Sequence, residues 1–377
     1  MNASSLRLDR VESREDLRRF LELPWRIFGG NPFWVPPLKK QVRAYLDLKH
    51  PFYFGSRAER ELFLVYRGNR PVGRVAAIVN RAHNAFHGDR WGFFGFFECE
   101  EDPEAVRLLF QGVEEYLQKK GCDTLVGPTS PSTNYECGLL VEGFDSRPTL
   151  MMPYNPPYYA SLLEGVGFTK AKDLYAYWSP VHSASLERLR RFVQRIQERE
   201  PQLRVRAVNL KDFAREVGII QEIYNLAWEK NWGFVPTSNE EFALLAKELK
   251  PLVDPHLLLV AFFGDNPAGF LLALPDVAPA LAQLNGSMGN PLRLLRAWWV
   301  GRKLEGLRLI TMGVKQEYRL RGAEGVMFYR GLQAALERGY RWCEYSWILE
   351  DNELAKRTVR LMDAKLSKIY RIYTKPL

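Results

Sequence analysis

The feature that most constrains the fold is an order of elements that occurs twice along the chain. In each half, the spacing of apolar residues predicts a strand, a helix, a hairpin, a strand, a helix, a strand, a helix and a last strand. The hairpins are expected to turn at Arg67–Arg70 and at Gly264–Pro267. Two tandem copies of one mixed α/β unit are the simplest fold with this order. The length of 377 residues agrees, because one core seldom serves so long a chain.

We divide the chain into a first unit at 1–180, a linker at 181–202 and a second unit at 203–377. The linker contains a charged amphipathic segment, 185–200, which is expected to be a helix. The first unit is predicted to contain helices at 14–28, 103–121 and 158–168, and strands at 6–13, 91–99, 123–128 and 176–180. The second is predicted to contain helices at 212–231, 239–253 and 353–364 and one beginning near 322, with strands at 203–209, 307–314, 341–348 and 365–375.

The turn after strand 307–314 is rich in arginine and glycine, and a helix is expected to begin in it, near Gly322. The first turn of a helix has N–H groups without an internal partner and attracts anions. Glycine lets a ligand approach the backbone closely. With Lys315, Arg319 and Arg321 nearby, the turn is a candidate phosphate site; the other interpretation is an ordinary strand–helix turn. It matches neither a P-loop nor a dinucleotide fingerprint.

These residues resemble the signature of the GCN5-related N-acetyltransferase (GNAT) family, Q/R-x-x-G-x-G/A after the fourth strand. Arg319 to Glu324 fill the six positions, with Glu324 in place of a small residue and Gly325 one place late. The resemblance covers 203–377 and, by element order and Gly167-Phe168, extends weakly to the first half. The acidic stretch 98–104 stands there instead of the basic turn. The chain therefore resembles tandem members such as mycothiol synthase, N-myristoyltransferases and Fem peptidyltransferases, with a degenerate first copy.

The resemblance implies an acyl-CoA cofactor bound by the second unit. A bulge at Gly313 would splay the fourth strand, so that a strand amide could stabilise an oxyanion. Asn352 would contact the pantetheine arm further along. The residues implied in cofactor binding are Met312, Gly313, Val314, Arg319, Arg321, Gly322, Ala323, Gly325 and Asn352.

The catalytic groups are less well marked. The family often places a tyrosine seven residues after the asparagine as the general acid, and this chain has Val359 there. The acid is therefore missing, supplied by water or moved to Tyr345, Tyr370 or Tyr373, each of which also suits a packing role. Candidate bases are Glu350 and Asp351, just past the fifth strand, and Glu229 in the first helix of the second unit; the first two also suit an acidic capping turn.

The acceptor site is expected to use both halves of the chain. The long loop 129–157 of the first unit is a candidate pocket wall, because loops of that length in compact domains are often functional. The residues singled out for the acceptor are Asn134, Glu136, Tyr154, Asn155, Trp228 and Trp232. The basic segment 292–306, with Trp298 and Trp299, favours a helix packed on its domain with a solvated basic face over a helix lying on a membrane.

Charge and composition restrict the function classes. The net charge of +9 fits a polyanionic ligand, either a nucleotide cofactor or, less favoured, RNA. No apolar run is long enough to span a membrane, and the N-terminus does not resemble a signal peptide, so we expect a cytoplasmic protein without stable membrane insertion. The four cysteines and five histidines do not show the spacing of metal ligands, so we expect no metal.

The leading hypothesis is an N-acyltransferase that transfers an acyl group, with acetyl as the first choice, from acyl-CoA to a small-molecule or peptide amine by direct attack. Two alternatives stay open: a Fem-like transferase that uses aminoacyl-tRNA, and a non-catalytic binding protein with the GNAT fold. The sequence identifies neither the acceptor nor the oligomeric state.

Overall fold

The computed structural model describes residues 5–229 and 231–377, and the chain in it forms two compact units. Unit 1 consists of Met1–Leu174, Ala278–Arg302 and Lys368–Leu377, and unit 2 of Tyr175–Val277 and Lys303–Ser367. Two late segments of the chain thus fold with the first unit, whereas the division inferred from the sequence followed chain order only. Strands β9 (Thr169–Pro180) and β15 (Lys365–Pro376) each begin in one unit and end in the other.

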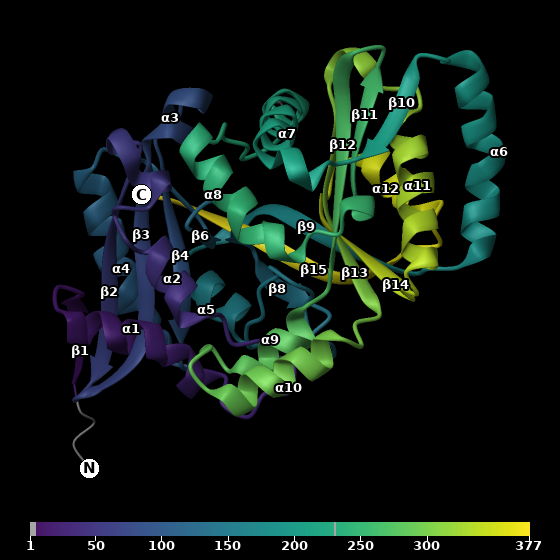
Figure 1. The fold of residues 1–377 in the computed structure, drawn as a ribbon. Helices are drawn as coiled ribbons and strands as arrows, with labels where there is room; N and C mark the ends of the chain where they lie inside the picture. The colour runs from purple at the N-terminus through teal and green to yellow at the C-terminus, as the bar shows by residue number, and fades with distance from the viewer. Residues whose placement is uncertain (1–4, 230) are drawn as a thin grey trace. The chain divides into compact units, whose positions relative to one another are not determined.

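Unit 1 contains a mixed sheet in which the strands follow the order β1-β2-β3-β4-β5-β15, with β8 also paired to β15 (Figure 1). Its strands are β1 (Leu6–Arg10), β2 (Ala58–Arg67), β3 (Arg70–Asn80), β4 (Trp91–Cys99), β5 (Thr124–Gly127) and β8 (Leu139–Glu142), and β6 (Thr129–Ser130) pairs with β7 (Glu136–Cys137) apart from it. Its helices are α1 (Arg14–Ile27), α2 (Lys39–Tyr45), α3 (Arg81–His87), α4 (Pro103–Lys119), α5 (Tyr159–Gly165), α9 (Ala278–Leu284) and α10 (Pro291–Gly301).

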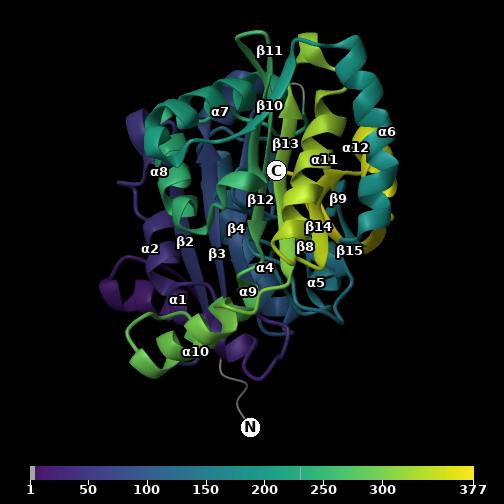
Figure 2. The same cartoon turned by 45° about the vertical axis from the view of Figure 1, so that its right-hand side comes forward.

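Unit 2 has the same kind of sheet, in the order β9-β14-β13-β12-β11-β10. Its strands are β10 (Leu203–Ala207), β11 (Leu258–Phe263), β12 (Asn266–Pro275), β13 (Gly306–Val314) and β14 (Trp342–Leu349), and its helices are α6 (Ser183–Arg199), α7 (Phe213–Trp228), α8 (Asn239–Leu249), α11 (Ala323–Glu337) and α12 (Glu353–Arg360). Helices α7 and α11 cover opposite faces of β12 (Figure 2). Phe270 meets Trp228 of α7, whereas the next residue, Leu271, lies against α11 at Gly331.

Local sequence accounts for the ends of the helices that frame the two sheets. Helix α4 begins where the Asp102 carboxylate accepts the N–H of Ala105 at 3.2 Å, with Pro103 at its first position. Its residues Val106, Leu109, Val113 and Leu117 recur at helical spacing and are buried in the core of unit 1. Helix α11 begins differently, after Gly322 with φ +92°, and no side chain caps it.

The mixed α/β fold predicted from the sequence is confirmed, as are both hairpins and the helix in the linker. The differences lie in the loops. The long loop 129–157 contains the short strands β6 to β8, and the seven-residue helices α2, α3 and α9 were not predicted. Among the helices of the described residues, none combines the length and the apolar character needed to cross a bilayer.

Candidate active site

The parallel pair β13–β14 in unit 2 comes apart part-way along its length. The two strands pair from Gly306 with Trp342 to Leu309 with Tyr345. Beyond that point β13 continues to Val314 and β14 to Leu349, and no further pairing joins them among the described residues. The strands therefore diverge in the middle of unit 2.

A bulge accompanies the divergence, and it is not at the predicted position. On the other edge of β13, Leu272 pairs with Thr311 and Ala273 with Leu309, which leaves Ile310 as the extra residue. The prediction of a bulge at Gly313 is wrong, because Gly313 pairs with Phe270 in regular register. A Cβ atom there would lie 2.2 Å from the indole of Trp228, so Gly313 makes room for that ring.

The diverging part of β13 is accessible. Residues Leu309 to Gly313 are partly exposed, whereas the residues on both sides, Gly306–Arg308 and Val314, are buried. An N–H on an accessible strand edge that has left its neighbour can donate to a bound carbonyl oxygen. The segment thus has the features of a site for a linear ligand that pairs with the backbone.

Trp228, one of the predicted acceptor residues, packs inside unit 2. Its ring stacks on Tyr224 with centroids 4.9 Å apart and lies 5.6 Å from Phe270. Trp232 is half-buried in the loop after α7. The Trp228 ring lies against β13 at Gly313, so its position is next to the accessible segment.

The basic turn before α11 uses its charges within unit 2. The Arg319 guanidinium donates to the carbonyl oxygens of Val314 at 3.1 Å and Ala227 at 2.6 Å. The Arg321 guanidinium forms two bonds to the Glu200 carboxylate, at 3.1 and 2.5 Å, and lowers the pKa of that carboxyl. Lys315 pairs with Glu222 at 2.5 Å. The three cations are therefore oriented by protein partners.

Helix α6 covers the glycines of the same turn. A Cβ atom on Gly322 would lie 2.6 Å from Ile196, and one on Gly325 would lie 2.3 Å from Phe192. Burial also raises the pKa of the Glu324 carboxyl in the first turn of α11. The accessible segment of β13 thus fits the extended arm of an acyl-CoA. The turn before α11 is covered by α6, so a diphosphate could not reach its backbone in this structure.

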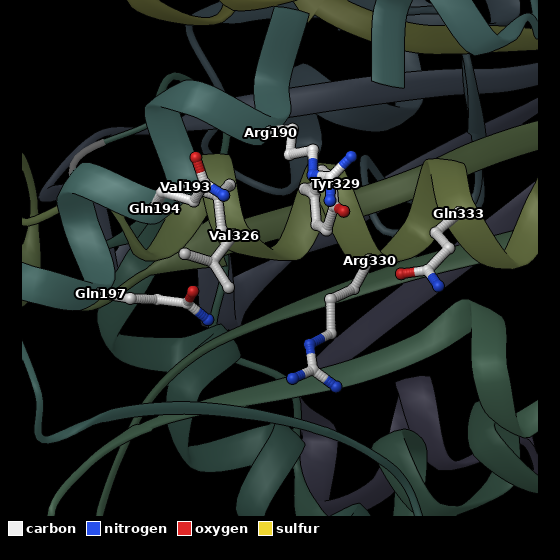
Figure 3. Close-up of a pocket in the computed structure, with 8 residues that line it drawn as sticks. All are labelled: Arg190, Val193, Gln194, Gln197, Val326, Tyr329, Arg330 and Gln333. Atoms are coloured by element: carbon white, nitrogen blue, oxygen red, sulfur yellow. The ribbon is translucent and has the colours of Figure 1, made fainter. Parts of the chain in front are cut away.

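The two helices also enclose a hollow of about 300 Å³. Figure 3 shows Arg190, Gln194 and Gln197 from α6 and Tyr329 and Arg330 from α11 around it. The contact between α6 and α11 is therefore tight at the glycine turn and looser along the helices.

Most other predicted cofactor and catalytic residues have structural partners. Asn352 caps α12, accepting the N–H of Ala355 at 3.0 Å. Lys356 donates to the carbonyl oxygen of Glu350 at 2.5 Å. Asp351 and Glu229 are exposed, at the ends of β14 and α7 respectively. Their catalytic roles stay predictions.

The tyrosines proposed as substitutes for the missing acid are buried. Tyr345 lies 3.2 Å from the Ser179 hydroxyl, and burial raises its pKa. In unit 1, Tyr373 donates to Glu164 at 3.1 Å, and burial raises its pKa to about 12. Tyr370 is fully buried in the same unit, and Val359 is buried in unit 2. These positions agree with packing roles.

A buried charged cluster lies at the point of divergence and was missed at the level of sequence. Arg308 donates from Nε to Ser346 Oγ at 2.9 Å and from its terminal nitrogen to the Ser346 carbonyl at 3.1 Å. The Ser346 hydroxyl donates to Glu344 at 2.8 Å, and all three residues are buried. The sequence signal was a single charged residue in each of two apolar strands. The parallel pairing of β13 with β14 places these two residues, Arg308 and Glu344, opposite each other.

Unit 1 has a counterpart of the diverging pair, and there the opening is filled. Strands β4 and β5 pair up to Phe93 with Val126. Beyond that pair the chain continues beside β4 in the same direction, so that a Cβ atom on Gly95 would lie 1.7 Å from the Thr129 carbonyl oxygen. The Ser130 hydroxyl accepts the N–H of Phe96 at 2.9 Å. The corresponding edge in unit 1 is therefore occupied by the protein itself.

The end of β4 holds a second group that the sequence did not reveal. Glu98 accepts the hydroxyl of Tyr159 at 2.7 Å and lies 3.6 Å from Arg74, which donates to the Phe20 carbonyl. Burial raises the pKa of Glu98 to about 7, because the nearby guanidinium compensates only part of the lost hydration. The acidic stretch 98–104 gave no sign that its first carboxylate is inside.

The predicted acceptor residues of unit 1 lie in different local environments. Asn155 exchanges bonds with the backbone of Leu140, at 2.7 and 3.1 Å, and so holds the loop together. Tyr154 accepts from Asn31 at 3.1 Å. The N–H of Asn134 donates to Ser132, and Glu136 is exposed on β7. Acceptor binding by these residues stays a prediction.

Comparisons with known proteins agree with this geometry. No protein-family model matches the chain. The solved structure of a tandem GNAT protein from the clavulanic acid biosynthesis pathway aligns with a TM-score of 0.56 and 12% identity, covering 99% of this chain and 98% of that one. The chain is 33% identical over 376 residues to the protein named bacterial ceramide synthase of Caulobacter vibrioides (strain NA1000 / CB15N), spanning 97% of this chain and 96% of that protein. The chain belongs to the family of this Caulobacter protein, and it has the fold of tandem GNAT proteins.

Within this tandem GNAT protein the similarity extends over both units. A second relative, Protein YghO of Escherichia coli (strain K12), is 31% identical over 373 residues, covering 97% of this chain and 94% of that protein. The diverging strands β13 and β14 are the fourth and fifth strands of the second GNAT copy, and β4 and β5 are those of the first.

Proposed function

We propose that this tandem GNAT protein is an N-acyltransferase that forms an amide between an amine and the acyl group of an acyl-CoA. The observation that carries the proposal is the accessible segment of β13, Leu309–Gly313, beyond the point where β14 leaves it. The fold of an acyltransferase supports it. Unit 2 would bind the donor.

The reaction requires a new C–N bond at the thioester carbonyl and loss of the C–S bond. An N–H of β13 near the Ile310 bulge would stabilise the negative charge on the carbonyl oxygen, a contribution worth about 10²- to 10³-fold in rate. The attacking amine must also lose a proton, for which Glu350, Asp351 and Glu229 are the candidate bases. The departing thiolate would take a proton from water, since Val359 replaces the family's tyrosine.

The acceptor we favour is a long-chain amino alcohol. The name of the Caulobacter relative, bacterial ceramide synthase, supports this choice, because a ceramide is the N-acyl derivative of a sphingoid base. The same name favours a fatty acyl donor over the acetyl group that we placed first from sequence. The partly exposed β13 segment would hold the pantetheine arm along Met312 and Gly313, whereas Val314, also predicted to line the arm, is buried.

The diphosphate of the donor would bind at the turn from Arg319 to Gly325 only after α6 moves. Ile196 and Phe192 cover the two glycines, and Glu200 pairs with Arg321. Movement of α6 would expose both the backbone N–H groups and the guanidinium. We therefore propose that donor binding is coupled to displacement of this helix.

The proposal is tested with the purified full chain, sphinganine, and acetyl-CoA or palmitoyl-CoA in separate reactions. The expected result is an N-acyl product detected by mass spectrometry, with release of one free CoA thiol per amide formed. Short polyamines and amino sugars serve as other acceptors. Amide formation with none of the acceptors would contradict the proposal.

A second candidate is a non-catalytic GNAT-fold protein. The covered glycines and the absence of the family's tyrosine at Val359 favour it. Acyl-CoA binding measured by calorimetry, without product from any acceptor, would support this alternative over the transferase.

A further inference from the structure

Helix α10 presents a large apolar surface to solvent. None of its residues is buried, although it carries two tryptophans and three leucines. Leu292, Leu295 and Trp299 follow a spacing of three and four residues, which places them on one helix face. Their exposed fractions are 69%, 61% and 56%, and Trp298 beside them is exposed by 57%. This contradicts the sequence-based expectation that only the basic face of the segment would be solvated.

The apolar face is held in position by unit 1. Helix α10 packs against α9, and the connection between them is anchored by the Trp25 indole, which donates to Asn285 at 2.8 Å. The N–H of Lys39 donates to the Gly286 carbonyl oxygen at 3.0 Å. Asn290 caps the start of α10. The surface is thus part of an ordered helical hairpin, seen as a green pair of helices in Figure 1.

The charges within this segment have one sign. The segment 278–302 contains Arg293, Arg296 and Arg302 and no acidic residue. The Arg302 guanidinium lies over the Trp298 ring, 4.9 Å from its centroid. Leucines and tryptophans flanked by arginines are the combination that lies in the interface of a bilayer, with apolar rings below the headgroups and cations against anionic lipid.

We propose that α10 docks unit 1 on the surface of a bilayer that contains anionic lipids. The helix would lie in the plane of the interface, because its 11 residues are about half of what is needed to cross the hydrocarbon. This inference rests on α10 and not on the proposed function, although a lipid acceptor would make such a position useful.

A second copy of the chain is the other possible cover for this face, and the charges disfavour it. In a symmetric dimer through α10, the arginines of one copy would lie beside those of the other. Like charges in contact are destabilising, whereas the same arginines attract phosphatidylglycerol. The face is also that of a single convex helix, which suits a deformable lipid surface.

The experiment is flotation of the full-length protein with vesicles of phosphatidylcholine alone or of phosphatidylcholine and phosphatidylglycerol in equal parts. We expect binding to the anionic vesicles that weakens with salt. The variant Leu295→Glu with Trp299→Ala should weaken binding by more than about tenfold, because two apolar anchors are lost and a negative charge is added. The matched control is Leu48→Glu, at a leucine of unit 1 that is 55% exposed and lies outside α9 and α10; it should bind like wild type.

Three outcomes would overturn the proposal. They are no binding of wild type to anionic vesicles, equal weakening by Leu48→Glu, and binding unaffected by the α10 variant. A dimer in sedimentation velocity that the α10 variant dissociates, without vesicle binding by wild type, would assign the face to a second copy instead. A melting temperature measured for each variant separates a loss of folding from a loss of docking. Acyl transfer in detergent is measured in parallel, so that failure of docking and failure of the proposed function are distinguished.

Discussion

The two units carry the same pair of parallel strands and differ in how the chain continues beyond the last paired residues. In unit 1 the chain stays beside β4, and the Ser130 hydroxyl accepts the N–H of Phe96. In unit 2 the chain leaves β14 for α12, and Leu309–Gly313 stays accessible. A duplicated fold can therefore keep its framework in both copies while one copy closes a strand edge that stays accessible in the other.

The helix after each fourth strand shows the same contrast. Helix α4 of unit 1 is capped by the Asp102 carboxylate, which also pairs with Arg67 at 2.5 Å. Helix α11 of unit 2 begins at Gly322 without a side-chain cap and with arginines before it. The Asp102 carboxylate therefore occupies the start of the first helix, whereas side chains of α6 cover the start of the second.

The largest expected effect is the loss of the group that accepts the proton of the attacking amine. The experiment identifies the unit that contains this group. If unit 2 does, Glu350→Gln or Asp351→Asn should lower turnover by about 10²- to 10⁴-fold with little change in acyl-CoA affinity. Glu98→Gln in unit 1 should leave turnover nearly unchanged. Steady-state kinetics with calorimetric binding test both. A large loss with Glu98→Gln, and none with the other two, would move the base to unit 1.

The next largest effect tests the strand edges directly. Ile310→Pro removes the N–H at the bulge, where proline is tolerated, and should reduce turnover by about 10²- to 10³-fold. Ser130→Ala removes the acceptor of the Phe96 N–H in unit 1 and should leave turnover close to wild type. Product formation is measured by mass spectrometry, and circular dichroism checks the fold. Equal effects in the two variants would contradict the assigned division of roles.

A third prediction concerns stability and pH in unit 1. Because the pKa of Glu98 is raised to about 7 in the folded protein, the folded state holds a proton that the unfolded state has released between its ordinary value of 4.5 and 7. The stability from this group is therefore complete below pH 4.5 and is lost as the pH rises towards 7, by up to about 3 kcal/mol. Urea unfolding across this range should show a shallower decline for Glu98→Gln. Parallel curves for variant and wild type would refute the assignment.

The smallest expected effect tests the cover over the turn in unit 2. Ile196→Ala removes the side chain that contacts Gly322, so α6 should move more easily and acyl-CoA should bind about tenfold more tightly, equivalent to about 1.4 kcal/mol. Leu189→Ala, also buried on α6, is the matched control for general loosening of the helix. One CoA per chain is expected in both titrations. Tighter binding in the control to the same degree, or two CoA per chain, would argue against the coupling.

The order of elements was predictable because it rests on local periodicity. The strand at 91–99 and the helix starting near Gly322 appear in the structure where the pattern placed them. The basic turn was also found from sequence, but its cover by Ile196 was not, since that contact joins residues far apart in the chain. Tertiary contacts of this kind leave no local signal.

Single glycines and single acids were the least predictable site residues. Gly313 was interpreted as a bulge, whereas it makes room for Trp228. Glu98 was grouped with the acidic residues that come after it, although its carboxylate accepts the hydroxyl of Tyr159 inside unit 1. A glycine can either form a bulge or make room for a neighbouring ring, and a glutamate can be exposed or buried. In both cases the tertiary packing decides, and the sequence around the residue does not show it.

The most direct test of the central claim compares both strand pairs in one measurement. Hydrogen–deuterium exchange of the full chain is followed by mass spectrometry with and without palmitoyl-CoA. We predict slower exchange on ligand binding in β13 from Leu309 to Gly313, with altered exchange in α6, and no change in β4 from Gly92 to Cys99. Protection in β4, or in neither strand at saturating ligand, would contradict the claim.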